Sequence, residues 1–461
     1  MRIGKRGFRS KIKSKLPIQF GEDSLTSYAG LEVIRQYLLS IGFMKRLVHT
    51  DAERRWRGDF RFVSVVLLLV GAILVGARRL SHVDYLNADP LVARFSELAR
   101  IPSSRSISRA LKKMTVLHQV DIDELSRFII ADSLESLHLP RLTLDMDGSV
   151  ITTGQKVGGA ARGYNPHNRK NPSYYPLSLM LAQTGHVWLH ENRAGSVHDS
   201  HDADASLRRA VATVRDELCY RGLLELRADS AFFAEHVLEA CDDTGVEYAI
   251  KVPMWPWLNI RALVEKQARW SRVDTQGDVE GFFANLEIPV WNRIERVAIY
   301  RTRRNRRPAK GIQLDLFNPD DGYWEYSVVA TNKSLGLAAL RKFTNGRGVQ
   351  EKTIAELKSG YAYGDVPTND FHANTAWQKL NVLTHNIATS FQLYHGAARK
   401  PRSLKRTVSF VLRSISTLRF EWLNKAGRLL RPAGRLILRL PANDNVRAHY
   451  VRFAEKLAST G

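Results

Sequence analysis

The stretch Leu142-Thr143-Leu144-Asp145-Met146-Asp147-Gly148-Ser149 alternates apolar with polar side chains and then reaches a Gly-Ser turn. Alternation with a period of two predicts a strand that has one buried face, and the turn ends that strand. Asp147 therefore stands at the carboxyl end of a predicted strand. Asp145 lies two positions earlier and on the same face, so it competes with Asp147 for any chemical role. The turn directly after Asp147 favours Asp147.

The segments after this strand follow a definite order of predicted elements. Two more strands surround a hairpin signal at Thr184-Gly185, and a helix, a strand, a helix and a fifth strand come next. Their predicted ranges are Ser173–Gln183, His186–Asn192, Asp202–Tyr220, Leu223–Asp229, Ala231–Asp242 and Val246–Val252. Three strands, helix, strand, helix, strand is the order of the RNase H-like α/β fold.

A last helix should complete this fold, and Gly348–Lys358 supplies it after a long interval. The interval contains the strand-like segments Val297–Arg301 and Tyr323–Ala330. It also contains several tryptophans, among them Trp255 and Trp257. We therefore predict a mostly β insertion inside the α/β domain.

The charge of the chain points to a polyanionic partner. The 461 residues include 69 Lys and Arg but only 46 Asp and Glu, a formal net charge of +23. Nucleic acid is the first expectation and an anionic membrane surface the second. The longest apolar run, Phe62–Ala77, is shorter than the roughly 20 residues of a membrane span. It predicts a buried core helix, so we expect no membrane partner.

The two cysteines exclude a disulfide framework and a Cys-rich zinc site. They fit a reducing compartment, so we expect a cytoplasmic protein.

Residues 25–137 are predicted to be helical throughout, with apolar side chains spaced three and four apart. Asp89-Pro90 begins one helix, expected to run to about Arg100. Ser103 or Ser104 caps a second helix that ends at Met114. That second helix carries Arg105, Arg109, Lys112 and Lys113. Helix, tight turn and basic helix is typical of a helix-turn-helix DNA reader, and a solvated basic face is the alternative.

A second aspartate, Asp229, ends the fourth predicted strand, which adjoins the first strand in this fold. Neighbouring strand ends can bring Asp147 and Asp229 together although they are 82 positions apart. Paired carboxylates supply the hard oxygen ligands that Mg²⁺ or Mn²⁺ prefers. A third carboxylate from the last helix, Glu351 or Glu356, would complete a two-metal site flanking a phosphate. The alternative is that each acid is a cap or turn residue.

Three segments resemble the motifs of bacterial insertion-sequence DDE transposases, in the RNase H-like cut-and-paste group with a β insertion. Asp147-Gly148-Ser149 resembles the first aspartate and its small hydroxyl neighbour. Ala228-Asp229-Ser230-Ala231-Phe232 resembles the second motif. The likeness covers most of the chain and implies a bacterial, nucleoid-associated protein.

The third motif of that family is tyrosine, two residues, arginine, three residues, glutamate, six residues and lysine. Arg347, Glu351 and Lys358 match its spacing in full, and this selects Glu351 over Glu356. The tyrosine position holds Thr344, next to Phe343, which is a departure from the motif. At these spacings Arg347, Glu351 and Lys358 share one helical face.

The resemblance implies a site and an activity. Asp147, Asp229 and Glu351 would bind two Mg²⁺ ions, for which Mn²⁺ can substitute, and Arg347 and Lys358 would hold DNA phosphate. The enzyme would bind the terminal inverted repeats of its element as double-stranded DNA. It would cut them through a hairpin and join them to target DNA as a homodimer, without a small-molecule cofactor. The alternatives are a metal-dependent nuclease without strand transfer and a non-catalytic DNA-binding regulator or degenerate transposase.

The resulting plan has five segments. They are a helical DNA-binding region (1–137), a first core part (138–252), a β-rich insertion (253–335), a second core part (336–395) and a basic C-terminal region (396–461). Two features stay open. The run His198–Asp204 resembles a metal cluster but stands where caps are expected. Trp255 and Trp257 are predicted either as core residues or as a stacking surface for a flipped base.

Overall fold

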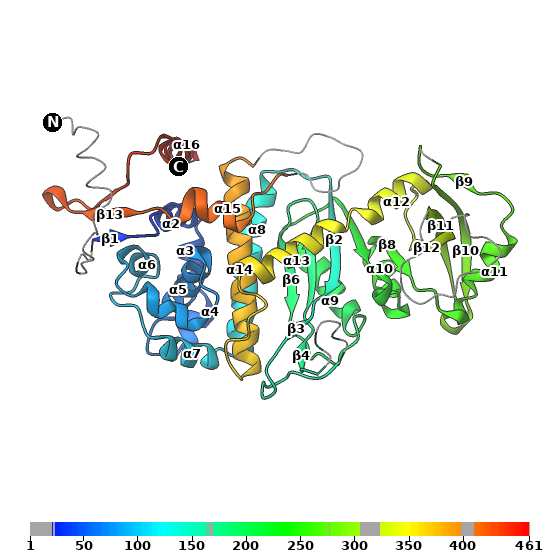
Figure 1. Cartoon of the computed structure of the whole chain (residues 1–461), viewed down its shortest axis with the longest axis horizontal. Coiled ribbons are helices and arrows are strands. Elements are labelled where there is room, and N and C mark those ends of the chain that lie inside the picture. Colours follow the sequence, from blue (N-terminus) through cyan, green and yellow to red (C-terminus); the bar gives the residue numbers. More distant parts are fainter. Residues whose placement is uncertain are drawn as a thin grey trace, which may run out of the picture.

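The computed structural model describes residues 21, 24–163, 165, 168, 170–275, 277–304, 323–397 and 410–460. The fold is mixed α/β. Figure 1 shows a helical body at one end, a sheet in the middle and a β-rich extension at the other end. The long helix α14 (Phe371–His395) stands between the helical body and the sheet.

The N-terminal part is helical, as predicted. After the two-residue strand β1 (Leu25–Thr26), its helices are α2 (Gly30–Ser40), α3 (Phe43–Val48), α4 (Asp51–Arg55), α5 (Phe62–Val75), η1 (Leu80–Leu86), α6 (Pro90–Phe95), α7 (Ser104–Lys113) and α8 (Val116–Glu135). Gly42, at φ 74°, separates α2 from α3. The helix that starts at Pro90 ends at Phe95 and not near Arg100. The Ser96 hydroxyl bonds the carbonyls of Val92 and Ala93, and Glu97 has a positive φ of 53°.

The apolar run forms helix α5, and all fourteen of its residues are buried. Within the described ranges, no single helix is long and apolar enough to cross a membrane. Helices α5 and η1 together have the length and apolar composition of a membrane span, but the chain bends by 87° between them. The core around α5 also contains α14 residues such as Trp377 and Phe391 and the C-terminal Trp422. Segments far apart in the sequence therefore share one hydrophobic core.

One sheet runs through the rest of the molecule, in the strand order β6-β5-β2-β7-β8-β12-β11-β10-β9. β2 is antiparallel to β5 and parallel to β7, and β7 is parallel to β8. The bounds are β2 (Arg141–Gly148), β5 (Leu177–Leu181), β6 (Val187–Glu191), β7 (Leu223–Ala228), β8 (Glu247–Val252), β9 (Ser271–Arg272), β10 (Val279–Ile288), β11 (Arg293–Arg304) and β12 (Tyr323–Thr331).

Two predicted elements differ in detail. The strand predicted at Ser173–Gln183 is divided into β4 (Ser173–Tyr174), which pairs with β3 (Ile151–Thr152), and β5. The break falls at Pro176, which has no N–H to donate to a ladder. The helix predicted at Ala231–Asp242 begins as the 3-10 turn η2 (Ser230–Phe232), and α10 (Glu235–Thr244) starts only after the extended Ala234.

The β-rich insertion extends the central sheet. β12 pairs antiparallel with β8, and β11, β10 and β9 follow. The sequence pattern indicated β11 and β12 but missed β10. The insertion also holds η3 (Pro256–Leu258), α11 (Ile260–Lys266) and η4 (Pro289–Trp291).

Helices cover the sheet and complete the C-terminal part. α9 (Ala203–Asp216) and α10 pack on one face of the sheet, and α12 (Leu337–Asn345) leads into the predicted last helix α13 (Gly348–Gly360). The C-terminal elements are α15 (Ile415–Leu418), the π-helix η5 (Arg419–Leu423), β13 (Gly427–Leu430), η6 (Pro432–Gly434), β14 (Ile437–Arg439) and α16 (Asp444–Thr460). β13 pairs with β1 and with β14. Five cations of the predicted basic C-terminal region lie outside the described residues: Arg399, Lys400, Arg402, Lys405 and Arg406.

Candidate active site

The carboxyl ends of β2 and β7 bring Asp147 and Asp229 to one cation. Arg347 Nη2 lies 2.9 Å from Asp147 Oδ1 and 3.4 Å from Asp229 Oδ2. β2 and β7 are parallel neighbours, so their carboxyl ends meet at one edge of the sheet. Arg347 is the residue before α13, and its side chain is only 13% exposed. The helix with the predicted third motif therefore begins directly over the two aspartates.

The environment of Asp147 opposes its negative charge. The pKa of Asp147 is raised to about 7, first by burial; Arg347 acts in the opposite direction, and the neighbouring carboxylates of Asp229 and Asp199 act in the same direction as burial. Asp229 is more exposed and caps the turn η2 by accepting a hydrogen bond from the N–H of Ala231. The two carboxylates thus have unequal surroundings, and both face the same cation.

Helix α13 is held on β2 by further contacts. Gln350, which is buried, donates from Nε2 to the backbone carbonyl of Asp145 at 3.2 Å. Lys358 donates from Nζ to the carbonyl of Val150 at 2.9 Å. Burial lowers the pKa of Lys358, and the carboxylate of Asp147 acts in the opposite direction. Arg347 and Lys358 therefore mark the two ends of a helix face that lies against the end of the first strand.

Asp145, the alternative to Asp147 for the first site position, is held in a buried ion pair with Arg227. Its two oxygens accept from Nε and Nη2 of Arg227, both at 2.6 Å, and both side chains are essentially inaccessible. Arg227 also donates to the carbonyl of Phe343 at 2.9 Å. A carboxylate in a two-point buried ion pair is a structural group, and this supports the choice of Asp147.

The structure does not bring Glu351 into contact with the aspartate pair. Its side chain is exposed on the first turn of α13. Among the described residues, no group of three His, Cys, Asp or Glu side chains is arranged to hold a metal ion. Glu356 points elsewhere and accepts from the N–H of Ile415. The assignment of Glu351 therefore stays a prediction, based on its place on the helix face between Arg347 and Lys358.

A third carboxylate near the pair, Asp199, was not predicted for this place. Tyr175 donates its hydroxyl to Asp199 Oδ1 at 2.7 Å. A Cβ on Gly148 would lie 2.3 Å from the same oxygen, so the absence of a side chain at 148 admits Asp199. Arg193 holds the loop by donating from Nη1 to the carbonyls of Asp199 and His201. Burial raises the pKa of Asp199, and Asp229 adds to this increase.

The run His198–Asp204 does not form a local metal site among the described residues. His198 bonds the hydroxyl of Ser200, and His201 pairs with Asp202 in an exposed contact of 3.3 Å. From this run, Asp199 lies near the aspartate pair, with its carboxylate beside Gly148. The sequence signal for it was only the density of acids after a strand.

The basic helix α7 has the predicted amphipathic character. Ile107, Ala110 and Leu111 are buried, whereas the cations of the helix are exposed. These cations are Arg105, Arg109, Lys112 and Lys113. Ser103 caps the helix by accepting from the N–H of Ser106 at 3.3 Å, and Asp84 accepts from both the N–H and the hydroxyl of Ser104. The structure presents a basic face, and DNA binding by this face stays a prediction.

Three tryptophans of the insertion, Trp255, Trp257 and Trp291, form a cluster. The rings of Trp255 and Trp257 stack at 5.4 Å with 22° between their planes, and Trp291 meets Trp257 edge to face. Trp255 is 38% exposed and Trp257 47%, so neither is a core residue.

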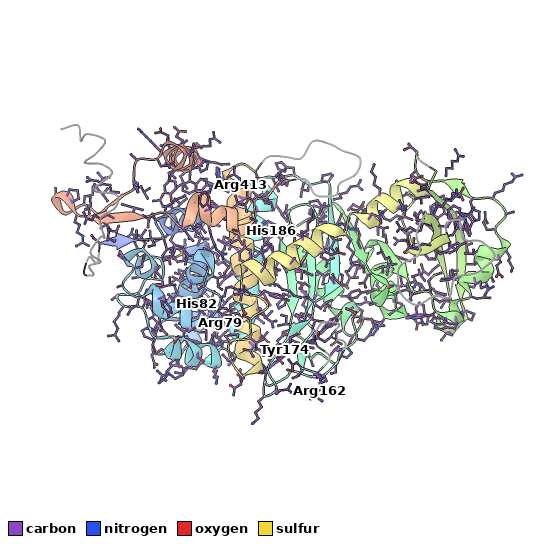
Figure 2. The ribbon with its side chains drawn as sticks, viewed as in Figure 1. Arg79, His82, Arg162, Tyr174, His186 and Arg413 are labelled. Carbon is purple, nitrogen blue, oxygen red and sulfur yellow. The ribbon has the colours of Figure 1, made fainter. Side chains whose placement is uncertain are left out.

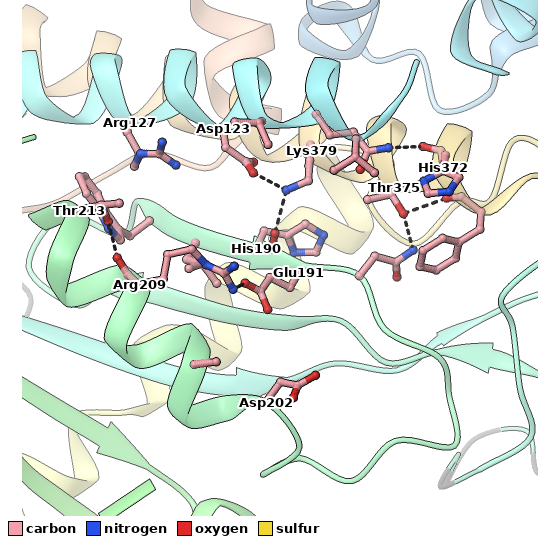
Figure 3. A pocket seen from close by; sticks show the side chains of 18 residues that line it. Asp123, Arg127, His190, Glu191, Asp202, Arg209, Thr213, His372, Thr375 and Lys379 are labelled. Carbon is pink, nitrogen blue, oxygen red and sulfur yellow. Dashed lines mark hydrogen bonds and ion pairs between the residues drawn. The ribbon is translucent and has the colours of Figure 1, made fainter. Parts of the chain in front are cut away.

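A separate cavity of about 600 Å³ lies between α8, β6, α9 and the start of α14 (Figure 3). Two ion pairs connect the elements that line this cavity. Asp123 of α8 pairs with Lys379 of α14, and Glu191 of β6 pairs with Arg209 of α9. Lys379 also donates to the carbonyl of His190 at 3.1 Å. These pairs fasten the helices to the edge strand, and none of Asp147, Asp199 and Asp229 lines this cavity.

Comparisons with known proteins bear on this arrangement. The sequence model described as transposase DDE domain group 1 matches residues 8–461. Curated proteins give no match to the sequence. Among solved structures, one similar chain is a piggyBac transposase in a synaptic complex with hairpin DNA, determined by cryo-EM. It has a TM-score of 0.38 and 11% identity, over 94% of this chain and 85% of that one.

Another similar structure is a Mos1 transposase in a paired-end complex with a left transposon end. The TM-score is 0.18 and the identity 12%, over 34% of this chain and 52% of that one. The family match alone spans nearly all of the sequence, and it includes both aspartates and the helix that carries Arg347. The chain belongs to the transposase DDE domain group 1 family.

Proposed function

We propose that this chain is a DNA transposase that binds the terminal inverted repeats of its own element, cuts there and joins the ends to target DNA. The observation that carries the proposal is the position of Arg347, whose Nη2 meets Asp147 and Asp229 at once. The strand order β6-β5-β2-β7-β8, with its directions, supports an RNase H-like core for this chemistry. In that core the two aspartates occupy neighbouring strand ends.

The family resemblance implies divalent metal, and the two aspartates fit it. Asp147 and Asp229 offer hard oxygen donors, and the pKa of Asp147 near 7 reflects burial and crowding of negative charge that a divalent cation would relieve. Asp147, Asp229 and Glu351 would hold two Mg²⁺ ions, with Mn²⁺ as a substitute. Such ions neutralise charge on the phosphate and lower the pKa of an attacking water.

The protein side chains have separate tasks in this proposal. Arg347 balances the two carboxylates before DNA arrives and then contacts the phosphate at the cut. Lys358, eleven residues after Arg347 and on the same helix face, fixes a second phosphate oxygen. The exposed cations of α7 grip the duplex outside the cut, and two protomers pair the two ends of the element.

The stacked pair Trp255 and Trp257 fits a role with an unpaired base. Two exposed, nearly parallel indole rings provide a stacking surface that tolerates any base. This supports the expectation that excision passes through a hairpin, in which a base near the end leaves the helix.

In vitro cleavage of the DNA flanking the reading frame, with Mg²⁺, tests the proposal. Wild type would run beside Asp229→Asn, with products resolved on denaturing gels. Nicks and hairpins at the element boundary, absent with the variant, are expected. Cutting without joined products would indicate a nuclease. Binding without any cutting would indicate a regulator or an inactive copy.

A further inference from the structure

We infer that the segment Gly154–Gly163, here called the glycine loop, binds DNA phosphates between the basic helix α7 and the aspartate pair. The inference rests on the proposed function and adds a contact surface to it. The partner is double-stranded DNA recognised through its backbone, without regard to sequence.

The composition of this part of the chain is unusual. Residues 148–190 contain no Asp or Glu, although the whole chain has 46 of them. The glycine loop itself carries Lys156 and Arg162, both exposed. Neither forms an ion pair with any other residue that the structure describes. Two exposed cations without acidic neighbours in sequence suit a phosphate backbone.

The glycine loop is fastened to the protein rather than free. The N–H of Gly158 donates to the carbonyl of Asn369 at 2.9 Å, and Tyr174 donates its hydroxyl to the carbonyl of Gly158 at 2.7 Å. Gly159 has φ +70°, and a Cβ there would lie 2.3 Å from the Phe371 ring. The loop therefore holds its cations in place, so that less conformational entropy is lost on binding.

Asn369 connects the glycine loop to the basic helix α7. Lys112 of α7 donates from Nζ to the side-chain oxygen of Asn369 at 3.0 Å, while the backbone carbonyl of Asn369 accepts from Gly158. The exposed face of α7, with Arg105 and Arg109, and the glycine loop are thus neighbours at the start of α14.

The other end of the glycine loop reaches the aspartate pair. Ala161 and Ser173 exchange two backbone hydrogen bonds, and a Cβ on Gly163 would lie 1.8 Å from the carbonyl oxygen of Gly195. Gly195 is four residues before Asp199, whose carboxylate lies against Gly148. Four residues span at most about 14 Å of extended chain.

Figure 2 shows Arg162 at the outer margin of the molecule, beyond Tyr174. A duplex held by α7 can therefore pass over the glycine loop to the carboxylates.

The salt dependence of DNA binding tests this inference. The double variant Lys156→Ala/Arg162→Ala is compared with wild type on two short duplexes, one from the DNA flanking the reading frame and one of unrelated sequence. The slope of log K against log salt is negative, and each lost phosphate contact reduces its magnitude by about 0.9, so a reduction of about 1.8 in magnitude is expected. Affinity should fall on both duplexes by the same factor, because phosphates carry no sequence information.

A control variant removes an exposed cation outside the DNA-binding region, Arg221→Ala, and should keep the wild-type slope. Arg221 precedes β7 and so lies at the opposite end of that strand from Asp229. Wild-type slope in the Lys156/Arg162 variant, with wild type binding DNA, overturns this inference alone. A wild type that binds neither duplex overturns the proposed function as well.

Discussion

Arg347 Nη2 lies 2.9 Å from Asp147 Oδ1, so the cation that begins helix α13 rests on the carboxylate that ends the first strand of the core. The contact connects positions 200 residues apart in the sequence. It makes the state of the carboxylates depend on the docking of α13, which also carries Glu351 and Lys358.

Replacing Arg347 should disable the site without unfolding the protein. Arg347→Ala removes the cation that lowers the pKa of Asp147, so that pKa should rise above about 7 and more of Asp147 should be protonated at neutral pH. DNA cleavage should fall by about 10²-fold or more, since a charged group at the reacting phosphate is lost. Cleavage rates across pH measure this, with an optimum moved to higher pH. Arg347→Lys should restore part of the rate, and an active Ala variant would refute the role.

The two glutamates of α13 should separate by function. Glu351→Gln should abolish cleavage and leave the melting temperature unchanged, because the side chain is exposed. Glu356→Gln should lower the melting temperature, because Glu356 accepts the N–H of Ile415 and so ties the C-terminal part to α13, while cleavage persists. Thermal melts and cleavage gels on the same preparations check both. The reverse pattern would assign the third carboxylate to Glu356.

Asp145 and Asp147 should differ in their effect on stability. Asp145→Asn breaks a buried two-point ion pair and leaves Arg227 without its partner, which should cost about 3–5 kcal/mol of unfolding free energy. Asp147→Asn should not lower stability, because burial already opposes the charge of Asp147. Urea denaturation at pH 8 measures both. Equal destabilisation by the two variants would contradict the division into a structural and a chemical aspartate.

Two buried histidines should make the protein sensitive to mild acid. His186 and His190 are fully buried, and burial lowers the pKa of each to about 3. The unfolded chain takes up these protons below a pKa of about 6.5, whereas the folded chain does not until about pH 3. Stability is therefore complete above pH 6.5 and falls as the pH decreases through this window.

From pH 7.5 to 5.5 each histidine should cost about 1.4 kcal/mol. Urea denaturation at the two pH values measures this loss of unfolding free energy. His190→Gln should reduce the loss by the contribution of one histidine, about 1.4 kcal/mol. A Gln variant with the full wild-type loss would show that His190 takes up its proton equally in both states.

Several features of the fold were predictable because they depend on local pattern. Alternating side chains place β2, β7 and β8, and acid or serine caps mark the starts of α6 and α7. The errors arise where a nonlocal or backbone effect intervenes. Pro176 divides a predicted strand, and Glu97, at positive φ, ends a helix early. β10 was missed although it pairs along its whole length with β11.

The sequence by itself determined which residues are available for chemistry: an aspartate after each of two strands, and a helix with Arg347, Glu351 and Lys358 on one face. The repeats of a strand and of a helix, which are properties of neighbouring residues, place these side chains, and the family resemblance selects Glu351 over Glu356. Only the tertiary structure showed that Asp145 forms a buried ion pair with Arg227 and that the carboxylate of Asp199 lies beside Gly148. The state of a carboxylate depends on burial and on nearby charges, and these come from segments that only folding brings together.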